Sequence, residues 1–345
     1  MKFIHTADLH LDAPVRALAE RAKVRREALA ALSEMIDYAE RNQIKYMVIA
    51  GDLFDSSCPS AATLGAVAEM MASAQMTFLI APGNHDAWQG ERYCGAEWPD
   101  NVFIFSPETS AFSTEEGTFI GVGFYEGMNG HPLSALIEGE GRCVVVTHGS
   151  LADSNPLHRI DEGVLSAMRA DYVALGHIHK GEDPHLVSGI WVGNPGSPAP
   201  HGFDEAGKRS FLEISIEQDG LHWQRIVTQG VRFWEEIIEI RESDSHSDIL
   251  GRLMVSAARY GEKDIFRFRL RGKTLCSLPD SLEEYPSLAE IIDETTLPFS
   301  LEKEAKEQTL RGYFIAQMLP LIDKAPDGEK QKYEAALRLG LEAFE

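Results

Sequence analysis

Several features that would indicate other classes of protein are missing from this sequence of 345 residues. It has only four cysteines and no CxxC pair, so we expect reduced thiols and a cytoplasmic location. No apolar run approaches the roughly 18 residues that a membrane helix needs, so we expect no membrane association. The first residues, MKFIHTADLHLD, reach His and Asp too early for a signal peptide.

Positive charge is also scarce. The 32 Lys and Arg residues face 54 Asp and Glu residues, which gives a formal net charge of −22. Affinity for DNA depends largely on Lys and Arg side chains that neutralise phosphates, so an evenly spread charge of this size would repel it. A nucleic-acid role would therefore need local basic patches, bound metal or a partner.

The first two-thirds of the chain alternates short β-rich runs with helical patterns, which predicts an α/β layered domain over residues 1–230. The helical patterns cover 15–41 and 60–75, and 210–216 with 221–227 form a closing hairpin. The expected earlier strands are Phe3–Ala7, Met47–Ala50, Thr77–Ala81, Val102–Phe105, Phe119–Gly123, Cys143–Thr147, Tyr172–Leu175 and Ile190–Val192.

After Gly230 the pattern predicts a small β-α-β unit over residues 231–278, with strands at 234–240 and 264–271 around a helix at 247–260. Three prolines in 279–299 predict a linker. Residues 300–345 are expected to form a helical hairpin that is broken at Pro320 and Pro326.

Polar side chains follow five of the expected strands. They are Asp8 and His10, Asp52, Asn84 with His85, His148, and His177 with His179. Ligands bind beyond the carboxyl ends of strands in open α/β sheets, so we expect these groups along one edge. A lone Asp or His at a strand end is commonly a cap, but five such strand ends together favour a site.

The donors are carboxylates, imidazoles and one amide, a mixture that suits Mn²⁺, Fe²⁺ or Zn²⁺. The candidate ligands are more numerous than one ion binds, whereas two ions that share a carboxylate would use all of them. These ligands are Asp8, His10, Asp52, Asn84, His148, His177 and His179. Such a pair of ions activates water and clamps the oxygens of a displacement at phosphorus. His85 follows Asn84 and is expected to point away from it and protonate the leaving oxygen. Ile178 is expected to point into the core between His177 and His179.

The ordered motifs DxH, GDxxD, GNHD, a single His after a strand, and GHxH resemble those of the calcineurin-like metallophosphoesterases over residues 1–230. The segments HTADLHLDAP and ALGHIHK, the β-α-β unit and the helical tail resemble SbcD-type DNA repair nucleases, in particular their YhaO-like bacterial branch. The resemblance implies a β-sandwich flanked by helices, a capping domain over 231–278 and a C-terminal helical segment.

The resemblance also implies roles for individual residues. Asp8, His10 and His179 would hold one metal ion and Asn84, His148 and His177 the other, with Asp52 bridging and His85 as the acid. It implies manganese and the hydrolysis of DNA phosphodiesters as a 3′–5′ exonuclease and endonuclease. Asp55 stands where archaeal and eukaryotic relatives have a histidine, which removes one candidate phosphate contact. The implied partners are DNA and an SMC-like ATPase; the oligomeric state, including a homodimer, stays open.

Two basic segments are candidates for holding a substrate. Arg16, Arg21, Lys23, Arg25 and Arg26 could meet a DNA backbone or form a solvated helix face with nearby glutamates. Arg267, Arg269 and Arg271 alternate with apolar residues and so share one face of a strand. That face could contact DNA or be balanced by Glu235 and Glu239.

Two other interpretations compete with a DNA nuclease. The same metal centre could serve a phosphodiesterase or phosphatase for nucleotides or other small phosphoesters, because the metals recognise only the phosphoryl group. The chain could also be a non-catalytic scaffold subunit, which the complete set of ligands argues against.

Overall fold

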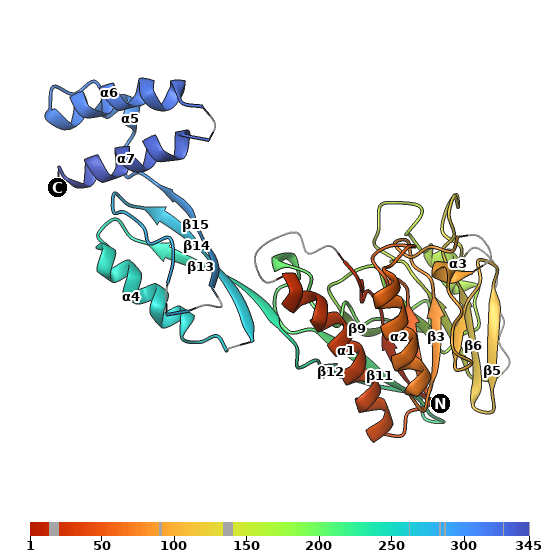
Figure 1. Ribbon diagram of the computed structural model, residues 1–345. Helices are drawn as coiled ribbons and strands as arrows, with labels where there is room; N and C mark the ends of the chain where they lie inside the picture. Colours follow the sequence, from red (N-terminus) through yellow and green to blue (C-terminus); the bar gives the residue numbers. More distant parts are fainter. Residues whose placement is uncertain are drawn as a thin grey trace. The chain divides into compact units, whose positions relative to one another are not determined.

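The computed structural model describes residues 1–13, 21–89, 92–133, 141–261, 263–282, 284–285, 288–326 and 328–344, with the side chains of 21–27, 289 and 331 excepted. The chain divides into two compact units, Met1–Arg232 and Phe233–Glu345. The elements of each unit are drawn in Figure 1.

The first unit contains two six-stranded sheets among its described residues. In the first sheet the order is β12-β11-β1-β2-β3-β4, with β1 to β4 parallel and β11 and β12 antiparallel. These strands are β1 (Lys2–Thr6), β2 (Tyr46–Ala50), β3 (Thr77–Ala81), β4 (Val102–Ile104), β11 (Ser210–Ile216) and β12 (Leu221–Val227).

The second sheet has the order β5-β6-β7-β8-β10-β9, with parallel pairing from β6 through β7 and β8 to β10. Its strands are β5 (Ser110–Thr114), β6 (Gly117–Val122), β7 (Cys143–Thr147), β8 (Tyr172–Ala174), β9 (Glu182–Val187) and β10 (Ile190–Asn194). Two edge strands, β5 and β9, are absent from the sequence prediction.

Successive side chains along each strand point to opposite faces of the sheet, and this alternation produces the layers of the fold. Phe3, Val48 and Leu79 face a core shared with Val144 and Tyr172 of the second sheet. Their neighbours along each strand face the helices α1 (Arg21–Arg41) and α2 (Ala61–Ser73) on the outer side of the first sheet. The short helix α3 (Glu162–Ser166) packs on the outer side of the second sheet. This is the layered α/β domain that the sequence pattern predicts, in the form of the sandwich flanked by helices that the family resemblance implies (Figure 1).

The second unit begins with a β-α-β pattern and then departs from the prediction. β13 (Arg232–Ile240), α4 (His246–Ala257) and β14 (Asp264–Lys273) are followed by β15 (Leu288–Thr296), which pairs in parallel with β14. The linker predicted over 279–299 is therefore wrong for the residues of β15. All three prolines of this segment lie outside β15, and Leu288 and Ile291 of β15 pack against the core of the three-stranded sheet.

The chain continues into α5 (Leu301–Glu304), α6 (Leu310–Lys324) and α7 (Lys330–Glu342), with α6 and α7 packed together. The break predicted at Pro320 is wrong, because α6 runs through it. A proline removes one backbone donor, and buried Ile315 and Ile322 anchor α6 on both sides of Pro320. None of the helices among the described residues combines the length and apolarity needed to cross a bilayer.

Candidate metal centre

The loops that follow β1 and β2 run side by side and carry the first three candidate ligands. The Asp8 amide donates to the Gly51 carbonyl at 3.0 Å, and the His10 amide donates to the Asp52 carbonyl at 3.0 Å. The parallel pairing of β1 and β2 thus continues beyond the strands and holds Asp8, His10 and Asp52 in one place.

Asp8 and Asp52 are buried carboxylates, each fixed through one oxygen. Oδ1 of Asp8 accepts from the His177 amide at 3.0 Å, and Oδ1 of Asp52 accepts from the His85 amide at 2.9 Å. Oδ2 of Asp8 has no hydrogen-bond partner among the described residues. A buried anionic oxygen without a partner is costly, and a cation would compensate it.

The first cluster combines Asp8 with His10 and His179. The Nδ1 atom of His10 faces Asp55 at 3.0 Å, and that of His179 faces Glu205 at 2.5 Å. A carboxylate only accepts, so these nitrogens carry the hydrogens and each Nε2 keeps a lone pair. The two Nε2 atoms lie 3.1 Å apart beside Asp8. Lone pairs that converge next to a carboxylate fit a metal cation.

The second cluster is built around buried His148. Its Nδ1 donates to the Ala50 carbonyl at 2.9 Å, while its Nε2 faces Asn84 Oδ1 at 3.0 Å and Asp52 Oδ2 at 3.2 Å. Burial alone would lower the pKa of His148, but Asp52 and then Asp8 raise it to about 9. A positive charge between this nitrogen and the oxygens is therefore favoured, supplied by a proton or by a metal ion.

His177 completes the second cluster less directly. Its ring centroid lies 5.3 Å from that of His148, and its Nε2 donates to Asp153 Oδ2 at 2.6 Å. The atom of His177 that remains available to a metal is thus Nδ1.

Asp52 lies between the two clusters. Its Oδ2 is 3.6 Å from His10 Nε2 on one side and 3.2 Å from His148 Nε2 on the other. Burial opposes ionisation, yet His148 and His10 keep the pKa of Asp52 well below its usual range. All seven predicted ligands are therefore brought together, with Asp52 in the position of a shared carboxylate.

His85 borders the same centre and is exposed. Its ring contacts that of His10 with centroids 4.7 Å apart, and its Nδ1 lies 3.2 Å from the Asp55 carbonyl and 3.5 Å from the Asp55 carboxylate. The side chain is 44% accessible to solvent. His85 is thus tethered at one nitrogen while remaining open to a substrate.

Other groups around the centre are absent from the sequence prediction. They are His131, Asp153, His158, His201 and Glu205. Four of them come from irregular loops and Glu205 from the short 3-10 helix Phe203–Glu205, where no periodic pattern or motif marks them. The expectation for Ile178 is wrong, because the side chain is 37% exposed. His177 has a positive φ of 80°, which ends the extended alternation that would have pointed Ile178 inward.

Arg16, a candidate substrate contact, lies outside the described residues, and so do the side chains of the basic positions from 21 to 26. The other candidates, Arg267, Arg269 and Arg271, form ion pairs with glutamates of the adjacent strands. Their carboxylate partners are Glu235 of β13 and Glu290 and Glu294 of β15. Of the two glutamates predicted to balance this face, Glu235 pairs with Arg267 and Arg269.

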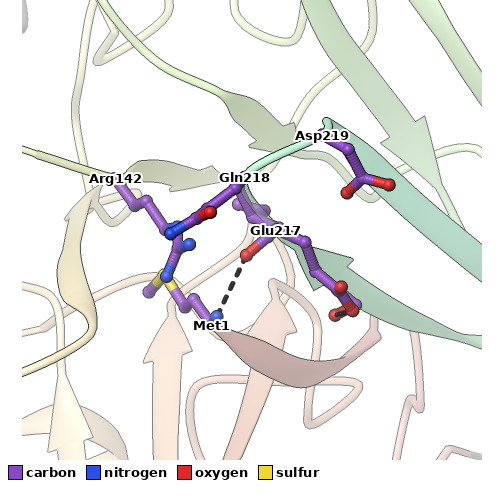
Figure 2. Close-up of a pocket in the computed structure, with 7 residues that line it drawn as sticks. Met1, Arg142, Glu217, Gln218 and Asp219 are labelled. Atoms are coloured by element: carbon purple, nitrogen blue, oxygen red, sulfur yellow. Dashed lines mark hydrogen bonds between the residues drawn. The ribbon is translucent and has the colours of Figure 1, made fainter.

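A pocket of about 530 Å³ lies at the opposite end of β1 (Figure 2). Met1, Arg142 and residues 215–219 of the β11–β12 hairpin line it, and the Met1 ammonium group donates to the Ile216 carbonyl at 3.1 Å. The candidate ligands follow the other end of β1, so this pocket is separate from the metal centre.

The layered α/β fold and the clustered ligands define a metallohydrolase. Residues 1–181 match the family model of the calcineurin-like phosphoesterases, which is more than half of the chain. The chain therefore belongs to the calcineurin-like phosphoesterase family and is a metal-dependent phosphoesterase.

Similar proteins include two curated bacterial relatives. The uncharacterized metallophosphoesterase YhaO of Bacillus subtilis is 25% identical over 347 residues, covering 89% of this chain and 79% of the relative. The SbcD subunit of the nuclease SbcCD of Escherichia coli is 23% identical, covering 64% of this chain and 66% of the relative. Among solved structures, a dimetal phosphatase from Danio rerio matches 65% of this chain and 95% of its own, with 14% identity and a TM-score of 0.44.

Proposed function

We propose that this protein is a two-metal phosphodiesterase that acts on DNA, as a 3′–5′ exonuclease and endonuclease in repair. The observation that carries the two-metal assignment is the place of Asp52, whose Oδ2 lies between His10 and His148. Asp8, His10 and His179 would hold one ion and Asn84, His148 and His177 the other, with Asp52 shared. Manganese suits these donors and is the metal we propose.

Divalent ions bound here would supply charge at the phosphoryl group and lower the pKa of a bound water. The residues of the chain do the rest. Asn84 contributes a neutral oxygen, which limits the negative charge beside a phosphate. Asp55 accepts from Nδ1 of His85, so Nε2 is the atom from which a protonated His85 would give a proton to the leaving oxygen.

The choice of DNA as the substrate has two supports. One relative is named as part of a nuclease, and this chain aligns with 66% of it. The chain also carries a second unit, Phe233–Glu345, after the phosphoesterase domain. The net charge of −22 makes unaided DNA binding unfavourable, so we propose an SMC-like ATPase as the partner that supplies the basic contacts. All four cysteines are free thiols, which suits the cytoplasm.

The test is to incubate the full-length protein with Mn²⁺ and end-labelled DNA, next to a generic phosphodiester ester. We expect shortened DNA, and a loss of about 10²- to 10⁴-fold in rate for His85→Ala, the usual contribution of a general acid. His185→Ala, at an exposed position of β9, is the matched control.

Each other outcome points to a different function. Intact DNA with a cleaved ester would assign the site to nucleotides or other small phosphoesters. Neither substrate cleaved, together with no bound metal after excess Mn²⁺, would make the chain a scaffold subunit.

A further inference from the structure

The two histidines of the GHIH segment are each held by a carboxylate from a distant part of the chain. His177 Nε2 lies 2.6 Å from Asp153 Oδ2, and His179 Nδ1 lies 2.5 Å from Glu205 Oε1. Each carboxylate accepts the ring hydrogen, so the opposite ring nitrogen keeps its lone pair. The nitrogen left for a metal ion is therefore Nδ1 in His177 and Nε2 in His179.

Glu205 is fixed by several donors besides His179. Its Oε2 accepts from the Ser197 hydroxyl at 3.2 Å and from the His201 amide at 3.3 Å. Arg209 lies 3.6 Å away and is itself buried, so its guanidinium group compensates the charge of the carboxylate. Glu205 is only 6% exposed. It cannot turn away from His179 without losing these bonds.

Asp153 lies in the loop between β7 and α3, which also carries His148. Its Oδ1 accepts from the Asn155 amide at 2.7 Å, which closes a tight turn and leaves Oδ2 for His177. His158 of the same loop reaches Asp153 Oδ2 at 3.6 Å and packs on His177 with ring centroids 4.2 Å apart. The loop therefore fixes His148 and His177 relative to each other.

These clusters could instead hold additional cations. Two groups of three residues each have ligand atoms within 4.8 Å of one another. One group is Asp153, His158 and His177, and the other is His179, His201 and Glu205. A neutral imidazole has only one lone pair, however. If His177 and His179 give theirs to the central ions, their other nitrogens carry hydrogens and cannot bind a further ion. The clusters then act through the two histidines.

We infer that Asp153 and Glu205 are positioning residues that set the affinities of the two metal sites separately, Asp153 through His177 and Glu205 through His179. The inference rests on the proposed function, which makes both histidines ligands. A carboxylate behind a metal-bound histidine fixes its ring and tautomer and raises its basicity, and losing such a partner typically costs about 10- to 100-fold in metal affinity.

The experiment is a calorimetric titration of metal-stripped full-length protein with MnCl₂, together with low-temperature electron paramagnetic resonance of the loaded protein. Wild type should bind two ions and show a spin-coupled pair. Asp153→Asn and Glu205→Gln should each weaken one ion about 10- to 100-fold and leave the other close to its wild-type affinity. At one equivalent of Mn²⁺ bound, each variant should show an uncoupled spectrum.

Two sets of control variants accompany these substitutions. Asp153→Glu and Glu205→Asp retain a carboxylate and should recover part of the lost affinity. Glu162→Gln, at an exposed position of α3, removes the same charge without contacting a candidate ligand and should bind as wild type does. Circular dichroism identifies any variant that does not fold, and Asp153→Asn, at a partly exposed loop position, tests the inference if buried Glu205→Gln fails.

Three outcomes would count against the inference or its basis. Folded Asp153→Asn and Glu205→Gln with wild-type affinities and spectra would overturn it. A wild type that binds more than two ions, with the surplus lost in these variants, would overturn it in favour of additional cation sites. A folded wild type that binds no ion would remove the proposed function itself, a result distinct from the other two.

Discussion

At the scale of single residues, the centre is built on unusual backbone conformations. Asp8, His10, Asp52 and His177 have φ values of 54°, 44°, 50° and 80°. Such conformations cost non-glycine residues about 1–3 kcal/mol each and persist only where the surroundings enforce them. Here the enforcing contacts are the bonds from the Asp8 and His10 amides to the next loop. The ligand positions are therefore set by the protein scaffold.

Gly51 allows one of these close approaches. Its φ is +92°, and a Cβ there would lie 2.1 Å from His148 Nδ1. We expect Gly51→Ala to displace His148 and to weaken Mn²⁺ binding, as measured by calorimetry. Gly189 has a similar φ of +87° but open space around it, so Gly189→Ala carries the same strain without the clash and should keep wild-type metal affinity. Equal affinities for the two variants would contradict the prediction.

His5 provides a prediction about pH. It is buried between the Tyr172 hydroxyl at 2.9 Å and the Leu175 carbonyl at 3.0 Å, and burial lowers its pKa to about 3. Between pH 6.5 and 3 the unfolded chain binds a proton at His5 that the folded chain does not. The contribution of His5 to the free energy of unfolding is thus fully present above pH 6.5. It decreases by about 1.4 kcal/mol for each pH unit as the pH falls below 6.5.

Urea unfolding at pH 7, 6 and 5 with a chelator present measures this dependence. His5→Gln should make the free energy of unfolding depend less steeply on pH, whereas exposed His185→Gln should leave that dependence unchanged. Identical slopes for wild type and His5→Gln would show that His5 does not contribute.

The sequence predicts the candidate ligands better than their supporting groups. Asp8, Asp52, Asn84 and His148 come within three residues of the end of a buried strand, and strand ends are visible as apolar runs that stop at polar residues. Asp153 comes from an irregular loop and Glu205 from the short 3-10 helix Phe203–Glu205, so only the folded chain brings them to His177 and His179.

At the scale of elements, central strands are predictable because both of their faces are buried. The central strands β3, β7 and β11 have the predicted bounds, and so does the edge strand β12, which the sequence indicates through its hairpin with β11. The edge strands β5 and β9 have exposed positions and weaker apolar patterns, so the sequence does not distinguish them from loops. β15 was obscured by the prolines around it.

The ion pairs of the three-stranded sheet in the second unit allow a test of whether Arg267, Arg269 and Arg271 contact DNA. Glu294 forms ion pairs with both Arg269 and Arg271, so a DNA phosphate would have to replace a carboxylate. If the arginines contact DNA, Glu294→Gln should raise the affinity and steepen the dependence of log K on log salt. Glu307→Gln, at an exposed position between α5 and α6 of the same unit, removes the same charge and controls for net charge. Fluorescence anisotropy across a salt series gives both quantities, and equal effects of the two variants would exclude the patch as a DNA contact.

At the scale of the whole molecule, the two units have separate cores. Ile315, Ile322, Leu337 and Leu341 of the second unit pack with residues from the same unit. Every candidate metal ligand belongs to Met1–Arg232. A ligand stabilises the structure that binds it, so metal should act on one unit alone.

Differential scanning calorimetry of the full chain should therefore show two transitions, of which Mn²⁺ raises only one. At a free concentration 100 times the Kd, one ion adds about 2.7 kcal/mol to the stability of the unit that binds it. Asp52→Asn should abolish the shift. Gly340→Ala should lower the other transition, because a Cβ there would lie 2.2 Å from the Phe314 ring, and should leave the metal effect intact. A single transition that moves as a whole with Mn²⁺ would mean that the two units unfold together, and that metal bound in the first also stabilises the second.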